Sequence, residues 1–425
     1  MRNWRPAAST TASSRAVAGR SNPVRPFDGR RILLGVTGGI ASYKSAWLAR
    51  LLTQSGAEVD VVLSRSAQEF VGAVTFEALT GRRVYSELIA AGHALDHIKL
   101  AREADVVVVA PATADFLARA ASGQSADLLG AVLLATTAPV LLVPAMNDRM
   151  WAHPQTVRNV EHLRQLGYGI LEPEVGPLAS AEEGSGPGRM PEPETIQAHL
   201  ARRLETLGPL FGKRIVVSAG PTREPVDAVR FVSNRSSGKM GVAIAASAWR
   251  RGSDVVLVHG PLGVPRPVGV RTIATETTEQ MLEAVGAEIK DAHVLVMAAA
   301  PSDFKPANAA QQKIKKGDAE LNIELAPTPD ILHGTIPQRA PNMIVVGFAL
   351  ETQDAEAYGR SKLASKALDL IVVNNANEPG AGFEVDTNRV TLIGRDGAAK
   401  SLPLLSKTEV ADAILDEVEG LLSGR

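Results

Sequence analysis

The sequence predicts an α/β protein with two doubly wound domains. Short continuous apolar runs recur along both halves of the chain, and segments with a helical pattern separate them. Such runs are typical of parallel strands that are covered on both faces. A stretch rich in Gly, Pro and Glu divides the two series, and the strand pattern starts again at Arg214. With 425 residues, the chain is long enough for two or three domains that each bury a core.

The first series of strands follows an N-terminal segment of low complexity. Residues 1–27 are rich in Ser, Ala, Pro and Arg, and we expect them to form a disordered extension. A transit peptide is the alternative, because arginines occur in this segment without any acid before Asp28. We place the first domain at residues 28–207 and the second at residues 208–425.

Each half of the chain has its own set of expected elements. In the first half we expect strands at 31–36, 58–63, 106–110 and 140–144, and helices at 43–54 and 196–207. In the second half we expect a strand that runs into a Gly-Pro turn at 214–222, and further strands at 254–258, 294–298, 344–348 and 370–373. We also expect an edge hairpin strand at 390–393, and helices at 241–251 and 409–422. The segment 176–193 is too irregular for a core element, and we interpret it as a linker or a surface loop.

The composition excludes several classes of function. The formal net charge is −1, so no overall field favours nucleic acid or an anionic membrane, and we expect neither as a partner. Because the chain has no cysteine, disulfides, cysteine metal sites and thiol nucleophiles are excluded. The missing cysteine fits a reducing compartment, and we expect a cytoplasmic location. No apolar run approaches the roughly 20 residues that a membrane-spanning helix needs.

Loops of the first half could bind an anion. In open α/β sheets, ligands bind beyond the carboxyl ends of the strands. The loops at 37–40, Ser64, 111–115 and 144–147 are expected there. Glycines in the first loop allow close backbone approach, and the helix that follows favours phosphate at its N-terminus. The sequence TGGIASYK is not GxGxxG, so a plain tight turn remains the alternative.

The second half contains the most specific stretch of the chain, AGPTREPVDAVRFVSNRSSGKMG at 219–241. Here SSGKMG opens a helix, and Ser236, Ser237 and Lys239 offer hydrogen-bond donors near its positive end. The stretch is not a Walker A loop. Lys362 and Lys366, four residues apart on an expected helix, share one face. A solvated surface is the usual interpretation of such a pair, but the neighbouring motifs favour a clamp for a triphosphate.

Four motifs of the first half occur together in one order: TGGIASYK, HIKL at 97–100, APATAD at 110–115 and PAMN at 144–147, followed by GPGRMPEP. This series resembles the flavin-dependent phosphopantothenoylcysteine decarboxylases and implies a flavodoxin-like domain. The resemblance implies FMN as the cofactor. The FMN-binding residues that it implies are Thr37, Gly38, Gly39, Ile40, Ser64, Pro111, Ala112 and Thr113.

The resemblance also implies two residues that act on the substrate. His97 would be the base, with His93 as its rival, and Asn147 would bind the substrate carboxylate. A neutral imidazole suits proton removal near pH 7, and an uncharged amide can hold a carboxylate that is about to leave. One departure is Ser180, which occupies the place where many relatives carry a cysteine, so the alternative is a flavin domain that is catalytically impaired or regulatory.

The motifs of the second half resemble phosphopantothenate–cysteine ligase, with a Rossmann-like domain. They are the 219–241 stretch, AAPSDF at 299–304, KIKK at 313–316, PDI at 329–331 and VGFALET at 346–352. The resemblance implies CTP as co-substrate, an acyl-cytidylate, and Mg²⁺ held mostly by phosphate oxygens and water. Arg230 and Asn234 would contact the acyl-cytidylate and the substrate. The residues implied around CTP are Met297, Ala298, Ala299, Asp303, Lys313, Pro329, Asp330, Ile331, Leu332, Phe348, Lys362 and Lys366.

Together the two resemblances imply a bifunctional enzyme of coenzyme A biosynthesis. It would join 4′-phosphopantothenate to cysteine and then decarboxylate the product to 4′-phosphopantetheine. The resemblance further implies a homo-oligomer, a dodecamer built from trimers of decarboxylase domains and dimers of ligase domains. A dehydrogenase with two nucleotide-binding halves is a rival, but neither half shows GxGxxG with an acid about 20 residues on. A non-catalytic regulator is the second rival.

Overall fold

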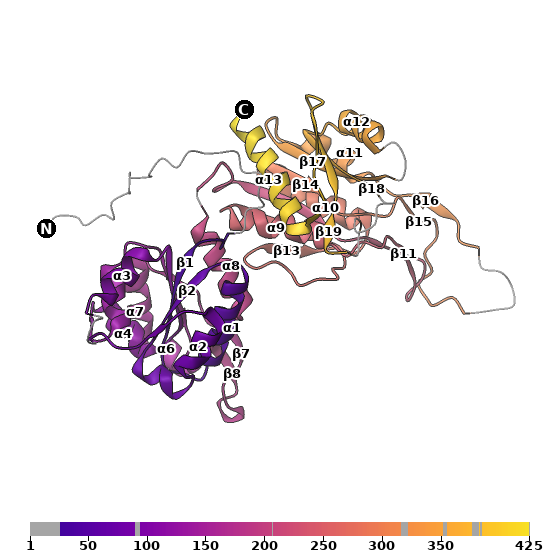
Figure 1. Ribbon diagram of the computed structural model, residues 1–425. Coiled ribbons are helices and arrows are strands. Elements are labelled where there is room, and N and C mark those ends of the chain that lie inside the picture. The colour runs from indigo at the N-terminus through magenta and orange to yellow at the C-terminus, as the bar shows by residue number, and fades with distance from the viewer. Residues whose placement is uncertain are drawn as a thin grey trace.

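The computed structural model describes residues 26–89, 94–205, 207–315, 322–351, 355–375, 382 and 385–424. The first 25 residues of the expected extension, the rival His93, Lys316 of KIKK and Thr352 of VGFALET lie outside these residues. Figure 1 shows the two halves of the chain as two α/β bodies side by side, with α8 (Pro193–Leu204) between them.

The expected extension extends too far at its C-terminal end. Phe27 is only 4% exposed, and it packs in one of the two apolar clusters of the first half. Its ring contributes buried apolar area that the Ser- and Arg-rich residues before it do not offer. The folded part of the chain therefore includes a residue that the sequence analysis placed outside it.

The first half is built on a six-stranded parallel sheet. The strands are β1 (Arg31–Val36), β2 (Glu58–Leu63), β3 (Val84–Tyr85), β4 (Val106–Ala112), β5 (Val140–Pro144) and β6 (Gly169–Ile170). Their order is β3-β2-β1-β4-β5-β6. Apart from the two-residue edge strand β3, this is the flavodoxin-like order 2-1-3-4-5, as predicted. The direction of the order reverses between β1 and β4, which is where such sheets bind ligands.

Helices cover both faces of this sheet. They are α1 (Ser42–Gln54), α2 (Ala73–Thr80), α3 (Asp96–Glu103), α4 (Ala114–Ala121), α5 (Leu128–Ala135), α6 (Asp148–Ala152), α7 (Pro154–Gln165) and α8, with the short 3₁₀ helices η1 (Arg65–Glu69) and η2 (Ala181–Glu183). In β4, Val106 and Val108 pack in one apolar cluster, while Val107 and Val109 pack in the other. Because side chains of a strand alternate between faces, a strand covered on both sides must be apolar throughout.

The segment interpreted as a linker or loop contains regular structure instead. β7 (Glu174–Pro177) and β8 (Ser185–Arg189) form an antiparallel hairpin. Its Gly- and Pro-rich sequence lacks the apolar alternation of a half-buried strand, so the pattern did not predict it. The hairpin packs against the first body of the molecule rather than linking the two halves (Figure 1).

The second half is built on an eight-stranded sheet of order β13-β12-β9-β14-β17-β18-β20-β21. These strands are β9 (Arg214–Ala219), β12 (Asp254–His259), β13 (Arg271–Ala274), β14 (Val294–Met297), β17 (Ile344–Glu351), β18 (Leu370–Asn375), β20 (Val390–Gly394) and β21 (Ala399–Ser401). The first six are parallel, in the 3-2-1-4-5-6 order of dinucleotide-binding folds, which confirms the Rossmann-like prediction. β20 does form a hairpin, but β21 is the edge strand.

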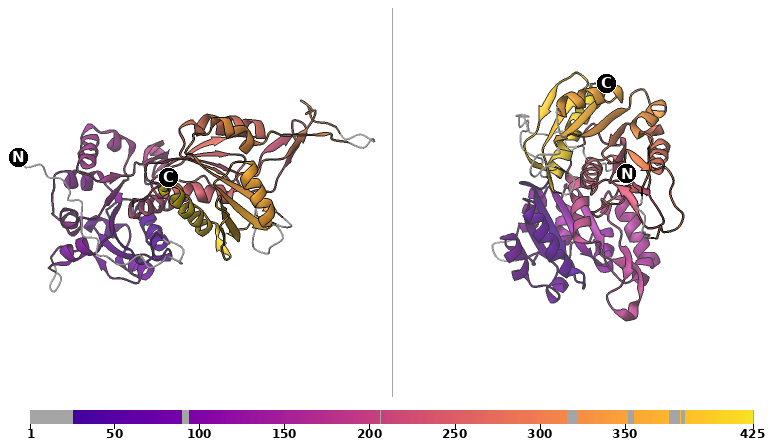
Figure 2. Two further views of the ribbon diagram at one scale, coloured as in Figure 1. Left: turned by 90° about the horizontal axis from the view of Figure 1, so that it is seen from above. Right: turned by 90° about the vertical axis from the view of Figure 1, so that its right-hand side faces the viewer.

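The remaining elements cover this sheet or project from it. The helices are α9 (Lys239–Arg250), α10 (Thr278–Glu288), α11 (Ile331–Thr335), α12 (Ala355–Ser365) and α13 (Lys407–Ser423), with η3 (Ile289–Asp291) and η4 (Ile336–Gln338). Three strand pairs complete the fold: β10 (Arg223–Pro225) with β11 (Phe231–Ser233), β15 (Phe304–Pro306) with β16 (Leu325–Pro327), and β19 (Thr387–Asn388) with β22 (Leu405–Ser406). Figure 2 shows the β10–β11 and β15–β16 pairs on the side away from the first body. No described helix is both long and apolar enough to cross a membrane.

Helix α8 connects the two bodies through packing on both of its sides. Ile196 and Leu200 are buried in the first core. On its other side, the His199 ring meets Trp249 of α9 edge to face at 5.0 Å, and the Arg202 guanidinium lies 4.7 Å from the same ring. Burial and the neighbouring arginines lower the pKa of His199 to about 4. This helix therefore belongs to the first core and packs against the second, where Ala198 contacts it, rather than being a free linker.

Candidate functional sites

The first candidate site is a cavity of about 600 Å³ at the carboxyl ends of β1, β4 and β5. This volume falls within the roughly 300–1,000 Å³ that is usual for ligand sites. The predicted residues that line it are Gly38, Gly39, Ile40, Pro111, Thr113 and Asn147. Apolar side chains, among them Met146 and Leu178, form much of the remaining wall. The apolar wall suits a flat aromatic ring. An anionic tail on that ring could be bound by the glycine backbone and the N-terminal end of α1 beside it.

Three other residues predicted to bind FMN do not line this cavity but lie in or beside the segments that form it. Thr37 is buried, and its Oγ1 donates to the Pro111 carbonyl at 2.8 Å while accepting from the Thr113 N–H at 3.0 Å. Thr37 thus ties the first loop to the third. Ser64 accepts from the Ala67 N–H and caps η1, and Ala112 is fully buried within β4. None of these three residues lines the cavity, and their predicted contacts with FMN stay predictions.

Asn147 lies where the cavity meets the β7–β8 hairpin. Its Oδ1 accepts from the Arg149 N–H at 3.0 Å at the start of α6, and its Nδ2 donates to Glu183 Oε2 at 3.1 Å. Leu178, Ala179 and Glu183 line the cavity, whereas Ser180 is exposed and does not. The structure therefore brings the hairpin to the predicted carboxylate ligand but leaves Ser180 outside.

His97 lies on α3, away from the residues that line this cavity. Its Nδ1 is buried without a hydrogen-bond partner among the described residues. Within one chain, the structure does not bring His97 to Asn147.

A charged cluster that the sequence analysis missed closes another side of the first cavity. The Lys44 ammonium donates to the Met190 carbonyl at 2.9 Å and to Glu192 Oε1 at 2.8 Å. Arg189 donates to the same carboxylate oxygen at 2.7 Å. The hydrogen bond from Lys44 is the main reason that the pKa of Glu192 lies below its usual value. Lys44 and Arg189 line the cavity, so they offer positive charge to an anionic ligand.

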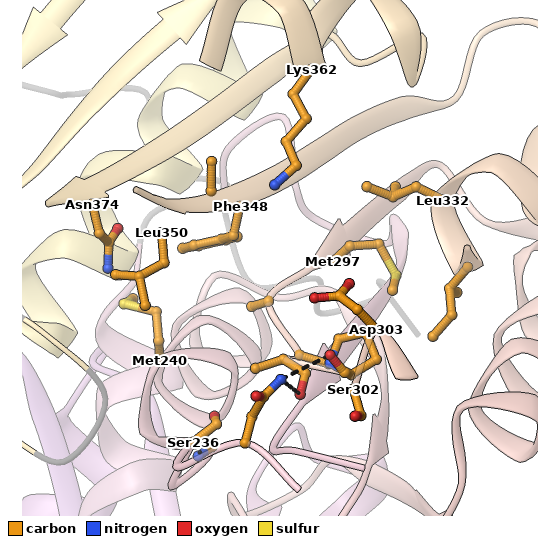
Figure 3. Close-up of a pocket in the computed structure, with 18 of the residues that line it drawn as sticks. Ser236, Met240, Met297, Ser302, Asp303, Leu332, Phe348, Leu350, Lys362 and Asn374 are labelled. Atoms are coloured by element: carbon orange, nitrogen blue, oxygen red, sulfur yellow. Dashed lines mark hydrogen bonds between the residues drawn. The ribbon is translucent and has the colours of Figure 1, made fainter. Parts of the chain in front are cut away.

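The second candidate site is a cavity of about 500 Å³ at the carboxyl ends of β14, β17 and β18. In strand order, β9 and β14 flank the switch point of the sheet, where ligands bind in this fold. The predicted residues that line it are Asn234, Met297, Ala298, Ala299, Asp303, Pro329, Asp330, Ile331, Leu332, Phe348, Lys362 and Lys366. In Figure 3, Lys362 and Asp303 extend toward the middle of this cavity from opposite sides.

Polar side chains fix the shape of the second cavity. Asn234 Nδ2 donates to the carbonyl oxygens of Ala300 at 3.2 Å and Pro301 at 2.9 Å, which joins the 219–241 loop to the segment after β14. Lys366 forms an ion pair with Asp330. Although burial acts to raise it, the pKa of Asp330 is lowered by the Lys366 ammonium and the N–H of His333.

Two predicted residues lie outside the lining of this cavity. The Arg230 guanidinium pairs with Asp227 at 2.6 Å and donates to the Ile314 carbonyl at 2.5 Å. It therefore connects the β10–β11 pair to the segment that carries Lys313. Neither Arg230 nor Lys313 lines the cavity in the described part of the chain.

Several lining residues had no signal strong enough to identify them in the sequence. Lys407, Asn374 and Asn388 come from segments without a recognisable binding motif, yet they line the same cavity as SSGKMG. Lys407 stands in Ser-Lys-Thr-Glu, which reads only as a helix-capping box, and Ser406 and Glu409 do form that box. Among the described residues, no group of three or more His, Asp or Glu side chains could hold a metal ion by itself.

Comparisons with known proteins agree with both halves of this structure. The family described as "Flavoprotein" matches residues 20–205, and "DNA/pantothenate metabolism flavoprotein C-terminal domain" matches residues 210–421. The coenzyme A biosynthesis bifunctional protein CoaBC of Mycobacterium bovis is 46% identical over 93% of this chain and 97% of that protein. The Bacillus subtilis protein of the same name is 43% identical over 93% of this chain and 98% of its own length.

One solved structure is similar to the second half alone. The crystal structure of the C-terminal domain of a coenzyme A biosynthesis bifunctional protein is 38% identical, with a TM-score of 0.44. It covers 51% of this chain and 100% of that one.

The fold and the matched families define a two-domain α/β protein, in which a flavoprotein domain is followed along the chain by a pantothenate-metabolism domain. The chain belongs to the family of the coenzyme A biosynthesis bifunctional proteins. It is an enzyme with a ligase and a decarboxylase activity, and the alternative of an impaired flavin domain is not favoured.

Proposed function

We propose that the second cavity binds CTP and 4′-phosphopantothenate and joins the latter to cysteine. The carboxylate of phosphopantothenate attacks the α-phosphate of CTP, which gives an acyl-cytidylate and releases pyrophosphate. The cysteine amine then attacks the acyl carbon and displaces CMP. The observation that carries this proposal is that Asn234, Asp303, Lys362 and Lys366, predicted from separate motifs, line one cavity at the switch point of the sheet.

The charges of this cavity suit phosphoryl transfer. Lysine ammonium groups can stabilise the charge that develops on the phosphate oxygens. Asp303 and Asp330 are the carboxylates of the lining, so Mg²⁺ would be held mainly by phosphate oxygens and water, with little help from the protein. Arg230 and Lys313, on neighbouring segments, would reach the substrate only if those segments move toward the cavity or belong to a second copy.

For the first cavity we propose FMN as the cofactor and phosphopantothenoylcysteine as the substrate. When bound, FMN supplies the electron sink that decarboxylation needs. Asn147 would hold the substrate carboxylate, which must displace Glu183 from its Nδ2. The apolar wall would exclude water from the bound substrate. His97 could act as the base only where a neighbouring copy brings its α3 to the cavity, which the proposed oligomer would allow.

We also propose domain boundaries, an oligomeric state and a cellular location for this protein. We place the decarboxylase at residues 27–207, because Phe27 packs in its core, and the ligase at 208–425, with the boundary between α8 and β9. We propose that the protein acts as a homo-oligomer in the cytoplasm, on small-molecule substrates.

Reciprocal asparagine variants test the assignment of the two cavities. Asn234→Asp puts a negative charge beside anionic substrates, so it should abolish CTP-dependent pyrophosphate release but keep the flavin and any decarboxylation. Asn147→Asp is the matched control, because it makes the same change in the other cavity and should abolish only carbon dioxide release. Normal ligation by Asn234→Asp would remove its assigned role. Failure of the unmodified protein in both half-reactions would end the proposed function.

A further inference from the structure

One end of the second cavity contains two lysines from distant parts of the sequence. Lys239 is the first residue of α9, and Lys407 is the first residue of α13. The two helices pack side by side, so both of their N-termini face this end of the cavity. Both lysines line the cavity together with Ser236, Asn374 and Asn388. The chain thus places two ammonium groups and two positive helix ends around one space.

This arrangement is electrostatically unfavourable for the protein alone. A cation at a helix N-terminus is repelled by the helix dipole, which favours anions there. Lys407 is also only 6% exposed, so its ammonium has lost most of its contact with water. Burial and the charge of Lys239 lower the pKa of Lys407 to about 8. An apolar side chain such as methionine at position 407 would avoid this cost to the stability of the ligand-free protein.

Contacts within the protein, among them the Asp386 carboxylate that acts to raise the pKa of Lys407, compensate this charge in part. Lys239 pairs with Asp386 at 2.6 Å, but the Asp386 side chain is 89% exposed, so water screens the pair. Lys407 donates to the Gly382 carbonyl at 3.0 Å, which is an uncharged acceptor. Because the pKa of Lys407 stays below its usual value, its surroundings in the protein do not fully compensate the buried charge.

A separate observation indicates a ligand at the same end. Asn374 Oδ1 is buried and has no hydrogen-bond partner among the described residues. Leaving such an acceptor unpaired costs roughly as much as a lost hydrogen bond, so buried polar atoms normally have partners. In Figure 3, Asn374 lies beside Leu350 and Met240 at the side of the cavity away from Leu332. A bound molecule with a hydroxyl or amino group could donate to this oxygen.

We propose that Lys239 and Lys407 together bind a phosphate group of a substrate of the second cavity. This inference rests on the proposed ligase function and adds Lys407 as a residue that contacts the substrate. A phosphate would neutralise both ammonium groups and both helix ends at once. The phosphate could belong to the triphosphate of CTP or to 4′-phosphopantothenate, since both carry the chemistry that this end of the cavity selects.

Calorimetric titration of the full-length protein distinguishes these two sources. CTP with Mg²⁺ and 4′-phosphopantothenate are titrated separately into the unmodified protein and into Lys407→Met. Lys400→Met is the control, because Lys400 pairs with Glu417 of the same helix but lies outside the cavity. We expect Lys407→Met to weaken at least one ligand by about 10- to 100-fold, as expected for a lost charge-assisted hydrogen bond. Lys400→Met should bind both normally.

The affected ligand identifies the source of the phosphate. Lys239→Met should weaken the same ligand, because the two lysines are proposed to share one group. Losses below tenfold for both ligands in Lys407→Met would overturn the proposal, as would losses for different ligands in the two variants. A ligand-free unfolding temperature of Lys407→Met below that of the unmodified protein would contradict the electrostatic argument. If the unmodified protein binds neither ligand, the proposed function itself fails.

Discussion

The buried carboxylate of Asp412 offers a quantitative test of how α13 is held in place. Asp412 is 4% exposed and accepts hydrogen bonds from Ser247, Arg250 and Arg251. The two arginines are 8% and 6% exposed, so their charges are compensated largely by carboxylates rather than by water. Asp412→Asn keeps the volume of the side chain but removes its charge.

The expected loss follows from the partners that remain. Removing one member of a buried ion pair typically costs about 3–5 kcal/mol. Here Arg250 keeps Glu205, and Arg251 keeps Asp416 at 2.8 Å, so we expect the lower end, about 3 kcal/mol. For a domain of this size, that corresponds to a fall of about 6–12 °C in the unfolding temperature.

Calorimetry measures the unfolding temperature, and hydrogen exchange with peptide resolution shows which domain is affected. Peptides from α9 and α13 should lose protection, whereas those from the β1–β6 sheet should not. Glu417→Gln is the control on the same helix, because it breaks only the exposed pair with Lys400 and should cost no more than about 1 kcal/mol. If Asp412→Asn lowers the unfolding temperature no more than Glu417→Gln does, the buried network does not stabilise the helix.

Three further predictions concern the two cavities. In Gly188→Ala, the new methyl group would lie 2.2 Å from the Met146 carbonyl oxygen, so the protein should purify with less FMN absorbance than Gly72→Ala. In Gly72→Ala the methyl group would make only an ordinary contact with Val74 at 4.0 Å. Equal flavin content in the two variants would contradict the cavity assignment. If His97 acts from a neighbouring copy, mixed oligomers of His97→Asn and Asn147→Asp should regain decarboxylation that neither variant has, and no recovery would argue against a shared site. Because the pKa of Lys407 lies near 8 in the fold against a usual 10.5, its protonation opposes folding most below pH 8. The stabilisation by Lys407→Met should therefore be largest below pH 8 and shrink toward pH 10.5, and a pH-independent difference would refute this origin.

The sequence predicted the fold well because its signals are local. Continuous apolar runs such as Val106–Ala112 identify strands covered on both faces, and their order along the chain implies doubly wound sheets. The motif residues around both cavities also follow strand ends, which is where this fold collects them. That is why residues chosen from the motifs alone, such as Gly38, Thr113, Asn234 and Lys362, line the two cavities.

What the sequence did not predict depends on contacts between distant segments. Lys407 is 168 residues from Lys239, and nothing in its own segment distinguishes a cavity lysine from a capping-box neighbour. The sequence of the β7–β8 hairpin has no apolar alternation, because the alternately buried positions of β8 are the glycines Gly186 and Gly188. For His97 the motif predicts a role in the first cavity, but within one chain His97 does not line that cavity.

Helix α13 carries a buried charge that destabilises the fold and also makes many contacts that stabilise it. Its first residue brings a buried ammonium to the cavity, an arrangement that disfavours the folded state when no ligand is bound. Three turns of the same helix bury Val410, Ile414 and Val418 against the sheet, and Asp412 fixes it to α9 through two arginines. The apolar contacts and the network together can offset the unfavourable charge at the N-terminus. A helix anchored in this way would hold Lys407 at a fixed place in the cavity, as the proposed phosphate binding requires.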